Sequence, residues 1–295
     1  MVDMKEIKSV GPASFTLMSS SIQAVLAFIF AVICAVAFGT ASAFVPELSN
    51  VAGVIAALGV AIIVILPISS FLTNVAISFI SIILYNGLAP RIGGIKLGFD
   101  GNEIRSIPAV PFALIMACIA MIWAFIIGVL LAAALIPLTG VIGTSLSSAT
   151  GVSMANLGTV GIFGALFLII VLPIIVFIAG FIVHALAAVF YNVLIPRVGG
   201  VKLELAVADN KNRIESIPVL PASLAISVVF AVFGLIIGLI SLITFSASGN
   251  VAGGFLSLVY NIIGYFLVYF ILVALVTIFY NLLAPKLGGI RLHLD

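Results

Sequence analysis

The chain has 295 residues, of which 64% are hydrophobic and only 7% carry a charge, and its mean hydropathy is +1.49. A soluble domain of this length needs far more polar surface, so the composition excludes a soluble globular protein and indicates an integral membrane protein. The net charge of +2 comes from 11 basic and 9 acidic residues, which is too small and too dispersed to favour nucleic-acid binding.

The first predicted elements are a short polar segment and two apolar spans. The segment Ile7-Lys8-Ser9-Val10 leads to Pro12, and apolar runs follow near 14–39 and 52–86. The second run has about 35 residues, which is roughly 50 Å of straight helix against about 30 Å of hydrocarbon. We therefore expect a kink or break at Pro67, with the outer half-helix on or above the membrane.

The second span ends in a distinctive sequence, Tyr85-Asn86-Gly87-Leu88-Ala89-Pro90-Arg91-Ile92-Gly93-Gly94-Ile95-Lys96-Leu97. We expect the proline to stop the helix and the glycine pair to supply the positive φ that the backbone needs to leave it. The stretches "GGIKLGF" and "EIRSI" then flank Asp100-Gly101, a pattern typical of a β-hairpin.

The same succession occurs twice more. The opening segment recurs as Ile104-Arg105-Ser106-Ile107 and Ile214-Glu215-Ser216-Ile217, and the ending recurs from Tyr191-Asn192 to Leu203 and from Tyr280-Asn281 to Leu292. Pro173 corresponds to Pro67, and a second hairpin is expected around Asp209-Asn210. Between these segments lie apolar spans near 111–137, 158–192, 221–245 and 252–281. The sequence thus predicts three repeats of two spans plus a strand, over 1–97, 98–203 and 204–295.

The two ends of the chain carry complementary halves of a hairpin, an opening strand in "MKEIKSV" and a closing strand in "GGIRLHLD". We expect them to pair and close a ring of three hairpins. Two spans per repeat give all repeats the same orientation. The predicted fold is a membrane all-α protein with a small cytoplasmic β cap: six transmembrane helices in three parallel two-helix repeats, with a pseudo-threefold axis along the membrane normal.

Charge distribution predicts the orientation in the membrane. All 11 Lys and Arg residues lie on one side of the six-span map, whereas the opposite loops, near 40–51, 138–157 and 246–251, hold Glu47 as their only charge. The positive-inside rule then places both termini and the repeated blocks in the cytoplasm. We expect a multi-pass protein of the cell membrane.

The two-span unit with its Tyr-Asn and Gly-Gly ending resembles a family of small bacterial transmembrane proteins known only as a domain of unknown function. The resemblance rests on Tyr85-Asn86 with Gly93-Gly94 and on the two later copies, and it covers nearly the whole chain as three tandem units. The Pro-Arg or Pro-Lys inside the motif departs from the family pattern. The resemblance implies no activity, cofactor or catalytic residue.

Three asparagines are candidate site residues because a threefold axis would repeat them as a ring at the cytoplasmic ends of the spans: Asn86, Asn192 and Asn281. A ring of amides can select or gate ions. The alternative, which we favour, is that each amide bonds backbone groups freed where the helix stops, while the preceding Tyr anchors in the membrane interface.

His184 is the only readily ionisable side chain within the core of a span, which makes it a candidate ligand or proton carrier. A hydrogen bond between helices is the interpretation that we favour. Cys34 and Cys118 are expected to be small buried hydrophobic residues. A further set of polar residues is expected to mediate helix contacts, although it could line a narrow path: Ser19, Ser20, Ser21, Gln23, Thr73 and Asn74.

No catalytic constellation, metal-binding pattern or cofactor motif is visible, so we expect a protein that is not an enzyme and takes no cofactor. The leading hypothesis is a non-catalytic membrane scaffold or accessory subunit of a membrane complex, in contact with membrane lipid and with another membrane protein or copies of itself. The alternative is a narrow-pore channel or transporter with a path along the pseudo-threefold axis. An enzyme acting on lipid has the least support.

Overall fold

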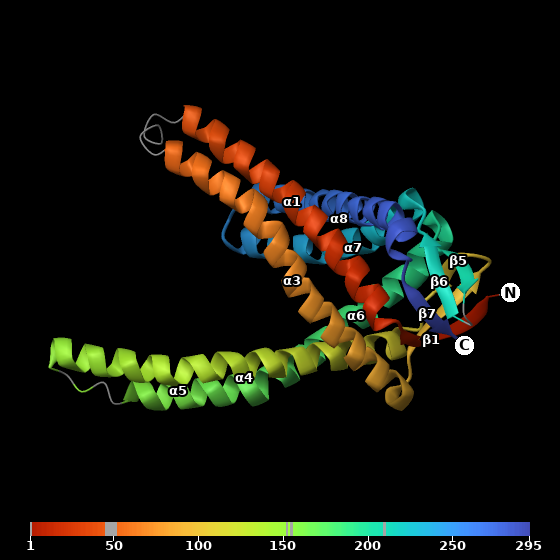
Figure 1. Ribbon diagram of the computed structural model, residues 1–295. Helices are drawn as coiled ribbons and strands as arrows, with labels where there is room; N and C mark the ends of the chain where they lie inside the picture. Colours follow the sequence, from red (N-terminus) through yellow and green to blue (C-terminus); the bar gives the residue numbers. More distant parts are fainter. Residues whose placement is uncertain (1, 45–51, 152, 154–155, 209–210) are drawn as a thin grey trace. The chain divides into compact units, whose positions relative to one another are not determined.

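The computed structural model describes residues 2–44, 52–151, 153, 156–208 and 211–295 (Figure 1). Glu47 and the predicted turn residues Asp209 and Asn210 lie outside the described residues. The chain forms two compact units, one of residues 1–107 with 190–295 and one of residues 108–189. This division differs from the three predicted repeats because the strands of all three share one sheet in the first unit.

Among the described residues, six helical segments are long and apolar enough to cross a membrane, as predicted, and they define a multi-pass membrane protein. The predicted loop at 138–157 is mostly helical, because α4 continues to Thr150 and ends at Gly151 with a φ of 69°. The helices are α1 (Pro12–Phe44), α3 (Ala52–Ile92), α4 (Ala109–Thr150), α5 (Asn156–Leu166), η1 (a π-helical turn, Phe167–Val171), α6 (Leu172–Val198), α7 (Val219–Ala247) and α8 (Val251–Leu287).

The two prolines expected to bend the second spans have different outcomes. Pro67 lies inside the uninterrupted helix α3, so the expected break does not occur there. Pro173, by contrast, directly follows Leu172 and the π-helical turn η1. Such a wider turn accommodates the hydrogen bond that a proline cannot donate, and it is a common cause of helix irregularity.

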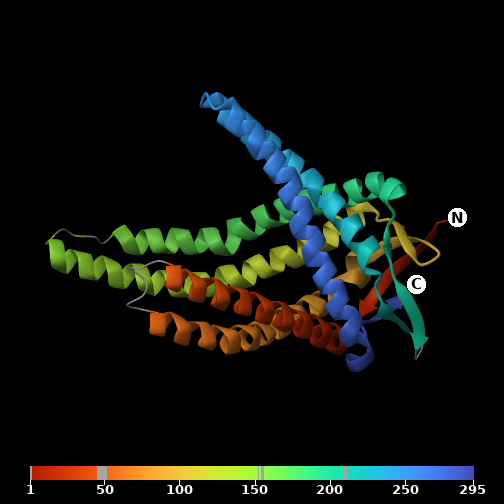
Figure 2. The same cartoon turned by 90° about the horizontal axis from the view of Figure 1, so that it is seen from above.

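A seven-stranded antiparallel sheet joins segments from the whole length of the chain, in the order β4-β3-β2-β1-β7-β6-β5. Figure 2 shows strands of this sheet beside the labelled N and C ends. Both expected hairpins are confirmed, as β2–β3 and β5–β6. The predicted pairing of the chain ends is also confirmed, with Ser9 opposite His293. The strands are β1 (Asp3–Val10), β2 (Ile95–Asp100), β3 (Glu103–Ser106), β4 (Val201–Lys202), β5 (Glu204–Ala208), β6 (Lys211–Ser216) and β7 (Arg291–Leu294).

The two edge strands of this sheet, β4 and β5, are consecutive in the chain and are separated only by Leu203. The Leu203 amide donates to the carbonyl of Asn102, so it continues the pairing with the β2–β3 hairpin. The expected six strands are therefore seven because one strand is interrupted at Leu203, and the sheet's two edges meet in one continuous segment.

Each helical hairpin is packed closely through glycine. In the second unit, a Cβ on Gly128 of α4 would overlap the backbone carbonyl of Leu168 in η1. In the first unit, a Cβ on Gly238 of α7 would lie 2.8 Å from a side-chain carbon of Leu258 in α8. Small residues let membrane helices approach this closely, and the resulting van der Waals contact is what holds them together. The relation of the three hairpins by a pseudo-threefold axis stays a prediction.

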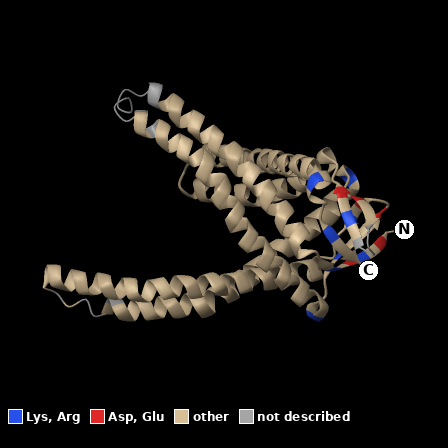
Figure 3. Cartoon of the chain, in the orientation of Figure 1, with Lys and Arg blue, Asp and Glu red and all other residues tan. Residues whose placement is uncertain are grey.

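The charged side chains of the described residues belong to the strands and to the helix ends that lead into them (Figure 3). Residues 108–189 carry no Asp, Glu, Lys or Arg at all. The helices between the strands are therefore apolar along most of their length, and the sheet carries charges of both signs.

Candidate functional site

The three Tyr-Asn and Gly-Gly segments place the same side chains at the junction of helix and sheet. The hydroxyl of Tyr85 donates to the carbonyl of Ile7 (2.5 Å) and accepts from the amide of Ile95 (3.0 Å). The equivalent distances are 2.6 and 3.1 Å at Tyr191 and 2.7 and 3.1 Å at Tyr280. All three rings are buried. The expectation that these tyrosines anchor in the membrane interface is therefore wrong: each hydroxyl bridges two strands inside the fold.

Each asparagine binds both backbone groups of one residue. Asn86 accepts from the amide of Val10 (2.9 Å) and donates to the carbonyl of the same residue (2.8 Å). Asn192 does the same at Ile107, with distances of 2.7 and 2.9 Å, and Asn281 at Ile217, with 2.8 Å for both. The side-chain amide thus acts as a peptide group would in a sheet, and it fixes the end of one helix to the start of its hairpin partner.

The favoured interpretation of the asparagines is correct in one respect and wrong in another. The amides do bind backbone groups, but those groups belong to the residue ahead of the first helix and not to the helix that carries the asparagine. Both polar atoms of each amide are engaged in this way. Ion selection by a ring of amides stays a prediction, and no hydrogen bond described here supports it.

The glycine pair after each asparagine has two separate tasks. The first glycine adopts a positive φ, 90° at Gly93, 88° at Gly199 and 90° at Gly288, and its amide closes the helix onto the residue four positions earlier. At the second glycine, a Cβ would overlap the carbonyl oxygen of the isoleucine that receives the tyrosine hydroxyl. The positions with this close approach are Gly94, Gly200 and Gly289.

The helices end at these glycines and not at the prolines before them. Pro90 and Pro196 lie within α3 and α6, each two residues before the last residue of its helix, and Pro285 has the same place in α8. The expectation that the proline stops the helix is wrong at all three positions. A proline removes only one hydrogen bond, whereas the left-handed glycine turns the backbone out of the helix.

Sequence reasoning missed an acidic residue at two of the three junctions. Glu6 accepts from the amide of Gly94 (2.8 Å), and Glu103 accepts from the amide of Gly200 (2.6 Å). The third junction has Arg213 at the corresponding place, paired with Glu215 at 3.0 Å. The acidic residue directly before the repeated Ile-basic-Ser sequence was the available signal.

His184, the other candidate, bonds within its own helix. Its Nδ1 lies 2.6 Å from the carbonyl of Gly180, one turn earlier in α6. Its ring meets the Phe112 ring of α4 edge to face, with centroids 5.9 Å apart. The favoured hydrogen bond between helices is therefore replaced by an intrahelical bond, and the contact to α4 is an aromatic one.

Polar residues of α1 and α3 meet as expected. Ser19 and Ser20 both donate to Oδ1 of Asn74, at 3.0 and 3.2 Å, so they connect the two helices inside the span. Cys34 and Cys118 are free and half-buried, in place of the fully buried positions expected.

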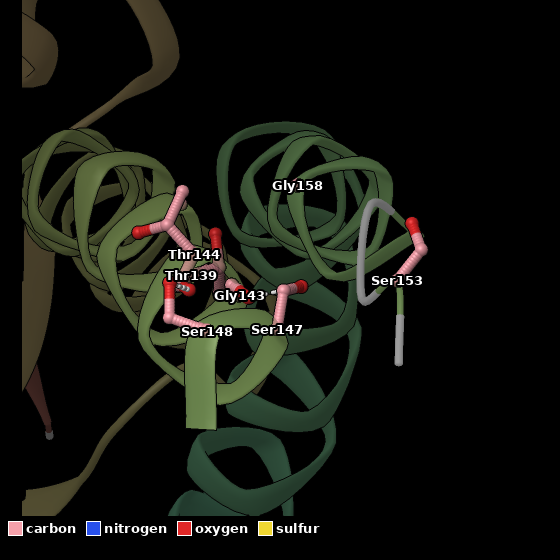
Figure 4. A pocket seen from close by; sticks show the side chains of 8 residues that line it. Thr139, Gly143, Thr144, Ser147, Ser148, Ser153 and Gly158 are labelled. Carbon is pink, nitrogen blue, oxygen red and sulfur yellow. Dashed lines mark hydrogen bonds between the residues drawn. The ribbon is translucent and has the colours of Figure 1, made fainter. Parts of the chain in front are cut away.

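A pocket of about 470 Å³ lies where α4 ends and α5 begins, and hydroxyl side chains of α4 line it (Figure 4). Thr139, Thr144 and Ser148 donate to carbonyls three or four residues earlier in α4. Such back-bonding satisfies a hydroxyl in an apolar environment. The pocket therefore offers neutral acceptor atoms and no ionisable group among its lining residues.

Among the residues that the structure describes, no group of three or more His, Cys, Asp or Glu side chains could hold a metal ion. The observations define a multi-pass membrane protein whose helix ends are held by an antiparallel sheet. Comparison with protein families, with curated proteins and with solved structures finds no match.

Proposed function

We propose that this protein is a non-catalytic membrane scaffold or accessory subunit that binds another membrane protein, or further copies of itself, through its charged sheet. One observation carries the proposal: the polar side chains of the three junctions, Glu6 and Glu103 among them, are used inside the fold, while other charges in and beside the strands are exposed. Asp3, Asp100 and Asp295 have side chains 67%, 57% and 72% exposed. Exposed charges of both signs suit a complementary protein surface better than a polyanion.

The proposal includes the arrangement in the membrane. Three hairpins of equal orientation would surround a pseudo-threefold axis along the membrane normal, with the sheet and both termini in the cytoplasm of a cell membrane. Support comes from the Lys and Arg residues, which all lie in the strands or next to them, as the positive-inside rule requires of a cytoplasmic face.

Labelling of single cysteines tests this orientation. In a variant without Cys34 and Cys118, a cysteine replaces either Asp100, at the end of β2, or Ser248, between α7 and α8. We expect a membrane-impermeant maleimide to label the Ser248→Cys variant in intact cells and the Asp100→Cys variant only after permeabilisation. The reverse pattern would contradict the proposed orientation.

Crosslinking in native membranes tests the scaffold itself. A photoreactive amino acid at Asp100 should give an adduct of discrete mass, and the same group at the lipid-exposed Leu256 should not. Because the contact is electrostatic, the Asp100 adduct should weaken as salt rises. If the protein is purified from these membranes without any adduct at Asp100, the scaffold function is contradicted. Solute flux through liposomes that contain the purified protein would contradict it as well.

A further inference from the structure

The α1–α3 hairpin carries uncharged polar side chains deep within its spans. Gln23 lies about 16 Å along α1 from Pro12, near the middle of a hydrocarbon layer of about 30 Å. With Ser69, Ser70, Thr73 and Asn74 of α3 it lines a pocket of about 230 Å³. The hydroxyls of Ser19 and Ser20 in α1 both donate to the side chain of Asn74. One wall of this pocket is therefore rigid and polar.

The polar pocket adjoins a longer apolar trough. The trough, of about 480 Å³, shares Gln23 and Ser70 with the pocket and continues between α1, α3 and α8 past Phe30 to Ile33. Its volume lies within the usual range for small-molecule sites. Going along α1 away from the sheet, the polar pocket comes first and the trough follows. This order suits a lipid whose head lies in the polar pocket and whose chain runs along the trough away from the sheet.

Three polar groups of this pocket lack a partner. In the part of the chain that the structure describes, no hydrogen bond satisfies the Gln23 amide or the hydroxyls of Ser70 and Thr73, and Gln23 and Thr73 are exposed. Water cannot satisfy them in the hydrocarbon layer, where an unpaired polar group costs several kcal/mol. A ligand with hydrogen-bonding atoms would remove that cost.

The other two hairpins act as an internal comparison. Counted from the residue that the asparagine binds ahead of each first helix (Val10, Ile107 and Ile217), Gln23 corresponds to Ala120 and Phe230. Counted back from the repeated tyrosine, Ser70 corresponds to Val176 and Tyr265, and Thr73 to Ala179 and Val268. The second hairpin therefore forms with apolar side chains at all three places, although the third has a tyrosine hydroxyl at Tyr265, so the two-helix architecture does not require the polar set of the first hairpin.

We propose that the pocket and trough bind a neutral lipid whose head presents hydroxyl and carbonyl oxygens, as diacylglycerol does. The Gln23 amide and the two hydroxyls supply both donors and acceptors for such a head, and the trough takes an acyl chain. A charged head does not fit, because the lining residues carry no charge and the site lies at hydrocarbon depth.

Photolabelling in lipid nanodiscs tests this site. The full chain is reconstituted in phosphatidylcholine with a trace of diacylglycerol that carries a diazirine on its acyl chain, and the labelled peptides are mapped by mass spectrometry. We expect adducts on residues that line the trough, competed by unlabelled diacylglycerol. The same diazirine chain on phosphatidylcholine is the control for general lipid contact, and it should label these residues no more than other lipid-facing positions.

Two variants connect the labelling to the polar groups. Gln23→Leu combined with Thr73→Val should lower the diacylglycerol adduct about tenfold, the loss expected for one or two hydrogen bonds. Ser70→Ala removes a single hydroxyl, so we expect a smaller loss of the diacylglycerol adduct. This variant keeps the test informative if the double variant misfolds, and thermal unfolding shows whether each variant is folded. Thr244→Val is the matched control, because that hydroxyl is satisfied by the carbonyl of Ile240.

Three results would overturn the lipid site: equal labelling by both probes, equal labelling of the wild type and the folded variants, or adducts spread evenly over all helices. Crosslinking of the pocket and trough residues to a second protein chain, without a lipid adduct, would also overturn the proposal. The occupant of the site would then be a protein helix and not a lipid.

Discussion

At the scale of single residues, three junctions use one set of contacts to join helices to strands. A tyrosine hydroxyl bridges two strands, an asparagine amide pairs with one backbone unit, and a glycine allows the chains to approach. Because these groups are removed from water, each lost hydrogen bond leaves an unsatisfied partner, which costs about 1–3 kcal/mol. The repeated residues are accordingly sites of stability.

The asparagine contact gives the first prediction. Asn192→Ala leaves both the amide and the carbonyl of Ile107 without their partner, so the free energy of unfolding in detergent should fall by about 2–4 kcal/mol. Asn250→Ala is the control, since that side chain only caps α8 at an exposed position and should cost about 1 kcal/mol. Equal losses in the two variants would show that the junction is no stronger than a surface cap.

The second glycine of the pair gives another prediction at this scale. In Gly200→Ala the new methyl group overlaps the carbonyl oxygen of Ile104, so we expect a loss of about 1–3 kcal/mol in unfolding free energy. Gly140→Ala meets no atom within 4 Å of its Cβ and lies inside α4, so it should be neutral or stabilising by up to about 1 kcal/mol. A stable Gly200→Ala protein would refute the close approach.

At the scale of elements, helical hairpins are held by close backbone contacts. Gly128 of α4 faces the π-helical turn η1, where the carbonyl of Leu168 approaches it. The π-helical turn η1 and Gly128 thus pack against each other. The turn lies just before Pro173, where the sequence predicts a kink or break. Pro67 has no such turn beside it in α3, although it holds the equivalent place in the sequence.

Enlarging Gly128 tests this packing. Gly128→Leu should lower the thermal unfolding midpoint of the protein, because the side chain must displace the backbone of η1. Gly140→Leu on the same helix has open space around its Cβ and should leave the midpoint nearly unchanged. If both variants melt alike, the glycine does not determine how α4 meets its partner.

Sequence reasoning succeeded where periodic hydrophobicity and local turn patterns carry the information. It predicted six apolar spans, both hairpins and the pairing of β1 with β7, because the two ends hold complementary strand sequences. It failed where a contact depends on distant residues: nothing near Asn86 indicates that its partner is Val10, and nothing near Gly94 indicates Glu6. The sequence had grouped Gln23, Thr73 and Asn74 as polar residues that mediate helix contacts or line a narrow path, but it did not indicate that Ser69 and Ser70 complete a pocket with them.

At the scale of the whole molecule, the sheet pairs strands from both ends of the chain with strands from its middle. β1 lies between β2 and β7, so residues near position 5 contact strands from near position 97 and from near position 292. Contacts of such sequence separation form late and slowly in folding. Each helical hairpin can pack locally before the sheet is completed.

A disulfide tests the pairing of the ends. In a variant without Cys34 and Cys118, Ser9→Cys with His293→Cys places the two cysteines directly opposite each other, and oxidation should crosslink them. Ser9→Cys with Ser106→Cys is the control, because β2 separates those strands by about 9.5 Å, beyond the reach of a disulfide. Mass spectrometry of peptides distinguishes the pairs, and a crosslink only in the control would contradict the strand order.

Because β4 and β5 are joined at Leu203, the strand order allows the chain to be circularly permuted. Since β7 lies beside β1, a flexible peptide linker could join the two ends of the chain, and new termini could be opened in the exposed turn between Gly101 and Asn102. Such a circular permutant should fold with all strand pairs intact. The order of strand pairing around the sheet therefore does not depend on which of its turns is left open.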